Sequence, residues 1–362
     1  MKKEIVNELF WLRSLSCLAV VLLHSIAASS YNFPENNQEL ANLFKQLSLF
    51  GTPTFVFISI FLISKFYPNG TPTGFLTKRF KYLLFPYVFM ALIYAIFDTY
   101  FALGHFNNAQ YLKEVLKNIV FGDYIAWFIP LILQLYILYS LVHKFLDKIS
   151  PVVIIPLSLL INIIYLLYFS ITKPLGIIPF SDYIWYRGYW ILFFGWIFYF
   201  VAGYYAAKHF KQYIEFVKKH IKTIVLITIF SSILLVSLTH FNIISAISTK
   251  RPDVLIYTSG MISIIIYIST KINNIPKFIV LVNNYSFSIY LLHSLFIYSI
   301  DPLPFMNQLT YTITIFILSA LFSIIVAHIV NKIPIGKYLV GNVQTQKKKR
   351  KKQTTEKYLT TK

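Results

Sequence analysis

Charged side chains are scarce in this chain of 362 residues: they make up 13% of it, while 57% of the residues are hydrophobic. Soluble domains carry roughly 25% charged and about 45–50% apolar residues. A soluble protein of this composition could not keep so much apolar surface away from water. A lipid bilayer removes that conflict, so the composition predicts an integral membrane protein.

Several sequence signatures of catalytic and binding sites are also missing. The single cysteine, Cys17, has no second cysteine with which to form an internal disulfide, and no Cys/His cluster has the spacing of zinc ligands. We therefore expect no metal site. The chain has no glycine-rich phosphate loop and no Gly-x-Ser-x-Gly elbow, so it lacks the signatures of P-loop nucleotide binding and of α/β-hydrolases.

Acidic residues are few, 13 against 33 basic ones, which gives a formal net charge of +20. Much of this excess lies in one basic run at 347–352, and the rest lies at the ends of apolar segments. That distribution indicates membrane topology and attraction to anionic lipids rather than nucleic-acid binding. We expect a transmembrane domain over residues 1–340 and a polybasic, disordered cytoplasmic tail over 341–362.

Long apolar segments recur along the whole chain. A transmembrane helix needs about 20 mostly apolar residues, because the hydrocarbon core is ~30 Å thick and a helix rises 1.5 Å per residue. About ten segments meet this requirement, which predicts an all-α, polytopic fold. The candidate spans are 9–28, 48–66, 82–102, 125–146, 151–171, 189–207, 222–240, 254–271, 279–299 and 309–331.

Basic residues in the loops orient these spans. With the N-terminus inside, most basic loop residues fall on the inner side, including Lys78, Arg79, Lys81 and the segment 208–222. An even number of spans returns the basic tail to the same side. The prediction is a multi-pass membrane protein with both termini cytoplasmic. The outer loops hold Lys45, Lys113, Lys117, Lys173, Arg187, Lys250 and Arg251.

The first span carries two ionisable residues, Arg13 and His24. Such groups cost free energy inside a membrane and are candidates for function. They lie eleven positions apart, close to three turns at ~3.6 residues per turn, so they share one helical face about 16 Å apart along the axis. The arginine falls in the inner half and suits phosphate or carboxylate recognition, and the histidine in the outer half can act as base or nucleophile.

Simpler interpretations of these two residues remain open. Arg13 can reach the inner headgroups with its long side chain, and His24 can be a structural histidine bonded to a carbonyl or a serine. A cleaved secretory signal is a rival for the whole segment, although Glu4 and Glu8 are atypical of a basic leader. Other intramembrane candidates are His293 and Asp98, either of which could orient the His24 imidazole.

Five stretches in this order resemble one known family, the membrane-bound acyltransferase family 3. They are Leu12-Arg13 with His24 after ten further residues, and the stretches 52–59, 78–87, 126–136 and 283–293. The second is similar to the family's "P-x-F-F-x-x-S-G" tract, with Ile60 in place of the glycine. The third has Lys81 where the family has a second arginine, and the fifth is similar to its "S-x-x-I-Y-L-x-H" segment.

The resemblance implies an O-acyltransferase of cell-surface glycans with about ten transmembrane helices. It implies an acyl-CoA donor on the cytoplasmic side, acetyl-CoA first among the candidates, and no tightly bound cofactor. The acceptor would be a hydroxyl of an extracytoplasmic or lipid-linked glycan. By the same resemblance, His24 is the catalytic histidine, Arg13 the intramembrane arginine, and Arg79 and Lys81, with Lys78 beside them, are candidates for donor binding.

The expected reaction leaves two routes open. His24 either deprotonates the acceptor hydroxyl directly or first accepts the acyl group itself. A different class of function also stays open, since relatives in the family have been discussed as exporters of polysaccharides or lipid-linked sugars. The small number of intramembrane charges, concentrated in the first span, favours the enzyme.

Overall fold

The computed structural model describes residues 7–343 except positions 175 and 178–179, and this part of the chain is helical without strands. The predicted all-α fold is confirmed. The predicted tail, 341–362, lies outside the described residues from position 344 onward. The helices are α1 (Asn7–Asn32), α2 (Glu39–Leu47), α3 (Gly51–Phe66), α4 (Phe75–Leu103), α5 (Asn108–Phe121), α6 (Phe128–Leu146), α7 (Pro151–Ile171), α8 (Ser181–Ile191), α9 (Ile197–Lys208), α10 (Phe210–His240), α11 (Asp253–Thr270), α12 (Lys277–Tyr298) and α13 (Gln308–Val330), with short 3₁₀ turns η1 (Ile125–Trp127), η2 (Phe193–Trp196) and η3 (Gly336–Tyr338).

Ten helical segments of the described chain are long and apolar enough to cross a membrane. They coincide with the ten predicted spans, except that three begin with a shorter helix before the spanning one: α2 before α3, α5 before α6, and α8 before α9. The chain is therefore a multi-pass membrane protein. We call the end of the bundle where α1 begins the near end, and the end where α1 finishes the far end.

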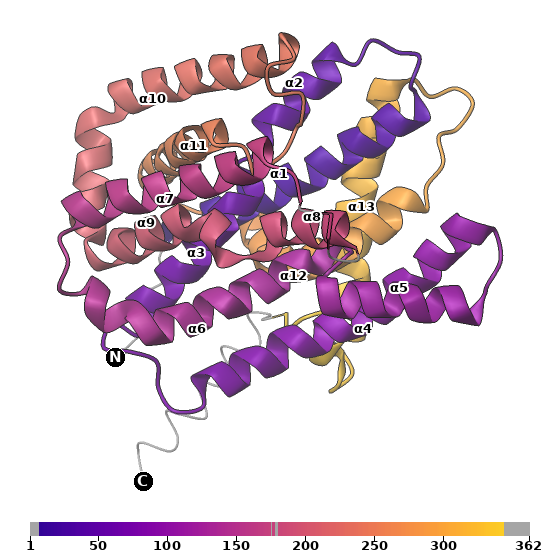
Figure 1. The fold of residues 1–362 in the computed structure, drawn as a ribbon, viewed down its shortest axis with the longest axis horizontal. Helices are drawn as coiled ribbons and strands as arrows, with labels where there is room; N and C mark the ends of the chain where they lie inside the picture. Colours follow the sequence, from indigo (N-terminus) through magenta and orange to yellow (C-terminus); the bar gives the residue numbers. More distant parts are fainter. Residues whose placement is uncertain (1–6, 175, 178–179, 344–362) are drawn as a thin grey trace.

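Helix α1 lies in the middle of the bundle and packs against α3, α11, α12 and α13 (Figure 1). Its buried face is rich in small residues, among them Ser14, Ser16, Ala19 and Ser25. Small side chains let helices approach closely, and polar ones bond across helices, which is how membrane bundles are held together without a hydrophobic driving force. The Ser14 hydroxyl, for example, donates to the carbonyl of Ile279 on α12 over 2.7 Å. This packing fixes the faces on which Arg13 and His24 lie.

The contact between α3 and α9 shows how the chain accommodates Ile60, which is fully buried. Gly203 on α9 faces it, and a Cβ atom there would lie 2.6 Å from the Phe57 carbonyl oxygen and 3.4 Å from the Ile60 Cβ. The two backbones therefore approach closely at a glycine. Here that glycine lies on α9, while the position on α3 carries a branched side chain.

Candidate active site

His24 meets His293 inside the bundle. The two imidazole rings lie with centroids 5.3 Å apart and planes tilted by 52°. Helix α1 provides the first ring and α12 the second, and these two helices pack along much of their length. Of the two candidates for a group beside His24, the structure brings His293 to it.

The hydrogen bonding of His293 fixes its tautomer. Its Nδ1 lies 2.8 Å from the carbonyl oxygen of Ile289, one turn earlier in α12. A carbonyl oxygen only accepts, so Nδ1 carries the proton and Nε2 has a free lone pair. That Nε2 is buried and has no hydrogen-bond partner among the described residues. A buried nitrogen that can accept a proton therefore lies beside the His24 ring.

Arg13 lies in the near half of α1 and belongs to a second group of polar side chains. Arg79 at the start of α4, Tyr136 on α6 and Cys17 lie close enough to act on it electrostatically. No ion pair within the described part of the chain involves Arg13 or Arg79. Two guanidinium groups thus act on each other electrostatically without a carboxylate of the described chain paired to either, an arrangement that attracts an anion.

The three basic residues at the start of α4 do not share one environment. All three side chains are exposed at the near end. The guanidinium of Arg79 lies over the rings of Phe75 and Tyr136, at 5.1 and 5.7 Å from their centroids. The ammonium of Lys81 instead lies 5.2 Å from the ring centroid of Tyr338 in η3. Arg79, unlike Lys81, therefore lies against Tyr136, the same side chain that acts electrostatically on Arg13.

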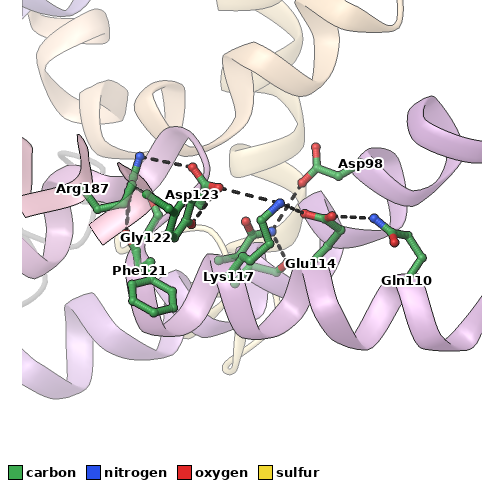
Figure 2. Close-up of polar contacts among 11 residues, drawn as sticks. Asp98, Gln110, Glu114, Lys117, Phe121, Gly122, Asp123 and Arg187 are labelled. Atoms are coloured by element: carbon green, nitrogen blue, oxygen red, sulfur yellow. Dashed lines mark hydrogen bonds and ion pairs between the residues drawn. The ribbon is translucent and has the colours of Figure 1, made fainter. Parts of the chain in front are cut away.

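Asp98 lies in a different polar network, which follows α5 (Figure 2). Its carboxylate accepts from the Asn118 side chain at 3.4 Å, and Glu114 and Lys117, which are paired at 2.9 Å, act on it electrostatically. None of the hydrogen bonds or ion pairs of the described residues joins Asp98 to His24 or His293. The structure thus places Asp98 with the helix that covers α4, away from the imidazole pair.

A lysine at the far end belongs to the surroundings of His24. Lys250, on the loop 241–252 between α10 and α11, acts electrostatically on His24. Its Nζ lies 2.9 Å from the ring centroid of Trp190 and 4.7 Å from that of Trp127. From the sequence, Lys250 was predicted only to be one of the basic residues in the outer loops. Its contact with the site joins segments more than 200 positions apart, and no local periodicity reveals it.

Sequence comparison bears on the chemistry of this site. The family defined by an acyltransferase domain matches residues 6–330, nearly the whole chain. The chain belongs to this acyltransferase family. It is accordingly a membrane enzyme that transfers acyl groups other than aminoacyl groups.

Curated relatives carry two kinds of name. The chain is 32% identical over 95% of its length, and 97% of the relative's, to the "Putative membrane-bound acyltransferase YfiQ" of Bacillus subtilis (strain 168). It is 26% identical to the "Probable poly-beta-1,6-N-acetyl-D-glucosamine export protein" of Staphylococcus aureus (strain Mu50 / ATCC 700699), over 82% of this chain and 84% of the relative. The protein of the same name from Staphylococcus epidermidis is 23% identical, covering 81% of each chain. No solved protein structure matches this chain.

Proposed function

We propose that this enzyme transfers an acyl group, acetyl first among the candidates, from cytoplasmic acyl-CoA to a hydroxyl of an extracytoplasmic or lipid-linked glycan, in a bacterial plasma membrane. The observation that carries the proposal is the placement of two polar clusters along α1. Arg13 interacts electrostatically with Arg79 in the near half, and the ring of His24 lies against that of His293 in the far half. One helix therefore links a cationic site to a proton-accepting site.

The near cluster supports an anionic donor. Arg13 and Arg79 have no acidic partner within the described chain, and guanidinium groups bind phosphate through their planar fork. The phosphates of CoA fit that chemistry, with the exposed Lys78 and Lys81 adding positive charge at the entrance. The thioester would then extend past Arg13 toward His24.

The far cluster supports proton transfer. In the direct route, His24 takes the proton of the acceptor hydroxyl while the hydroxyl oxygen attacks the thioester carbonyl. The new C–O ester bond forms, the C–S bond breaks, and the CoA thiolate takes the proton back from the imidazolium. His293, whose Nε2 is free, would orient the His24 ring or share its proton. The alternative route passes the acyl group through His24 itself.

Export of a polysaccharide or lipid-linked sugar is the second candidate function, favoured by the names of the staphylococcal relatives. A path for large sugars should expose ionisable and polar side chains along several spans. Apart from Asp98 on α4, the intramembrane candidates Arg13, His24 and His293 lie instead at two points along α1. That concentration supports group transfer over passage.

The test is to delete the protein in its host and measure ester-linked acyl groups on the cell-surface polysaccharide. The intact chain, His24→Ala and His240→Ala are then restored at equal membrane levels. His240 is an exposed histidine at the end of α10 and serves as the matched control. We expect the esters to return with the intact chain and the control, and not with His24→Ala. Unchanged esters with reduced surface polysaccharide would instead support the exporter.

A further inference from the structure

Lys250 is buried in a way that is unusual for a lysine in a loop. Only 4% of its surface is exposed. Lysines at a membrane surface normally extend their amines into water. Here the amine lies against Trp190 and Trp127, and none of the hydrogen bonds or ion pairs of the described chain uses it. The amine therefore has aromatic faces beside it but no hydrogen-bond acceptor or counter-ion among the described residues, and this costs free energy, so its position calls for a ligand or a catalytic use.

The backbone around Lys250 is held in place from both sides. The Tyr189 hydroxyl donates to the Lys250 carbonyl over 2.5 Å. The next residue, Arg251, is 3% exposed, and it bonds to the Leu235 carbonyl at the end of α10 and to the carboxylate of Asp253 at the start of α11. The loop is therefore anchored to three helices. These hydrogen bonds hold the loop in a conformation in which the Lys250 side chain is buried.

The charged groups that face Lys250 offer it no counter-ion. Arg187 and His24 are the ionisable side chains that interact with it. The nearby carboxylate of Asp123 pairs with Arg187 at 3.2 Å, and Arg187 also donates to the carbonyls of Phe121 and Gly122 (Figure 2). Burial lowers the pKa of the Lys250 amine well below its usual value, and the Arg187 charge lowers it further. A neutral amine has N–H donors and a lone pair, which matches a sugar hydroxyl in both roles.

We propose that Lys250 is an acceptor-binding residue whose amine hydrogen-bonds to the sugar unit presented to His24. The inference rests on the proposed function and identifies a residue that binds the acceptor sugar. With the donor held in the near half by Arg13 and Arg79, the acceptor has to approach His24 from the far end, where Lys250 lies. The rings of Trp127 and Trp190 lie beside the amine and offer it no hydrogen-bond acceptor, so the sugar supplies the missing hydrogen bonds.

The test measures acceptor and donor binding separately, with purified protein in lipid nanodiscs. The acceptor probe is surface polysaccharide from the deletion strain, free of acyl esters, and the donor is radiolabelled acetyl-CoA. The variants are Lys250→Met, which keeps the length of the side chain, Lys250→Arg, which keeps the N–H donors, and Lys113→Met, an exposed far-end control. Transfer gives the apparent KM for polysaccharide, and binding of CoA reports the donor site.

We expect Lys250→Met to raise the apparent KM for polysaccharide about tenfold, the loss of one hydrogen bond, with CoA affinity unchanged. Lys250→Arg should recover part of this loss, and the control should match the intact chain. An unchanged KM in Lys250→Met would overturn the proposal, and so would equal weakening of both substrates with a lower melting temperature. If Lys250→Met does not accumulate, Lys250→Gln is judged by the same criteria. Intact protein that binds CoA but transfers no acyl group would overturn the proposed function itself.

Discussion

The near and far halves of α1 have different chemical surroundings. In the near half, Arg13 lies with Arg79, a permanent cation whose side chain is exposed at the membrane surface. In the far half, His24 lies with the fully buried ring of His293 and the buried amine of Lys250. The near half is suited to holding a charged group in place, and the far half to moving a proton. One helix thus separates a cationic site from a site suited to proton transfer by about three turns.

Replacing His24, in the far half, should have the largest effect on catalysis. His24→Asn keeps a polar side chain but removes the imidazole, so we expect kcat for acyl transfer to fall about 10³-fold, within the range for loss of a general base. CoA binding should be unchanged, because the proposed function assigns the donor phosphates to the near half. Full activity in this variant would show that the histidine is structural.

Replacing Arg13 should affect the donor. Arg13→Met removes the charge, and we expect the apparent KM for acyl-CoA to rise about 10- to 100-fold, as for a lost charge-assisted contact. Arg13→Lys keeps the charge without the planar fork, so its apparent KM for acyl-CoA should lie between those of the intact chain and Arg13→Met. The measurement is CoA affinity against ionic strength, and an unchanged affinity in Arg13→Met would place the donor elsewhere.

Replacing His293 should produce a smaller loss. In His293→Gln the side chain retains hydrogen-bonding capacity but has no titratable nitrogen beside His24. We expect kcat to fall about tenfold, comparable to the loss of an orienting partner, with both KM values little changed. A loss as large as that of His24→Asn would mean that His293 itself is the base.

Lys250 offers a prediction for stability against pH. Because burial lowers its pKa, the folded protein keeps the amine neutral where the unfolded chain carries it charged. Unfolding therefore takes up a proton below about pH 10.4, and the stability of the intact protein rises with pH toward that value. Lys250→Met should raise stability by about 1–2 kcal/mol or more at neutral pH, because folding no longer has to remove the proton from this amine. This gain should shrink toward pH 10.

The check is a series of melting temperatures of Lys250→Met and Lys113→Met in detergent between pH 7 and pH 10. A gain that grows with pH, or an equal gain in the exposed control, would contradict the assignment of a neutral buried amine.

Asp98 should have the smallest effect on activity. Its carboxylate bonds to Asn118 in the network along α5 and to neither imidazole. Asp98→Asn should leave kcat and both KM values within about twofold, since an amide can still accept from Asn118. A large fall in kcat alone would show that Asp98 reaches the reaction site through a rearrangement of α5.

Much of the fold follows from sequence patterns with strong physical causes. Ten apolar segments of spanning length predict ten helices, because no other backbone arrangement of such segments satisfies its hydrogen bonds in lipid. The three additional helices α2, α5 and α8 were missed. They are short and lie next to spans, so the apolar run dominated the pattern at those positions. The orientation of the termini and the polybasic tail remain predictions.

Parts of the site were also accessible from sequence. The spacing of Arg13 and His24 placed them on one face of α1 by helical periodicity alone. The pairing of His24 with His293 was one of two options that the sequence left open, because nothing in the chain states which face of α12 turns toward α1. Lys250 could not be found in this way, since a loop lysine is typical of a solvated surface.

The sequence determined the solvent, the number of spans and the periodicity of α1, because each depends on local composition and on the fixed rise and turn of a helix. The tertiary structure decided which groups interact: His24 with His293, Arg13 with Arg79 electrostatically, and Lys250 with the rings of two tryptophans. Those contacts join segments far apart in the chain, and helix packing at small residues sets them. Their physical origin is the close approach of whole helices, which no single segment encodes.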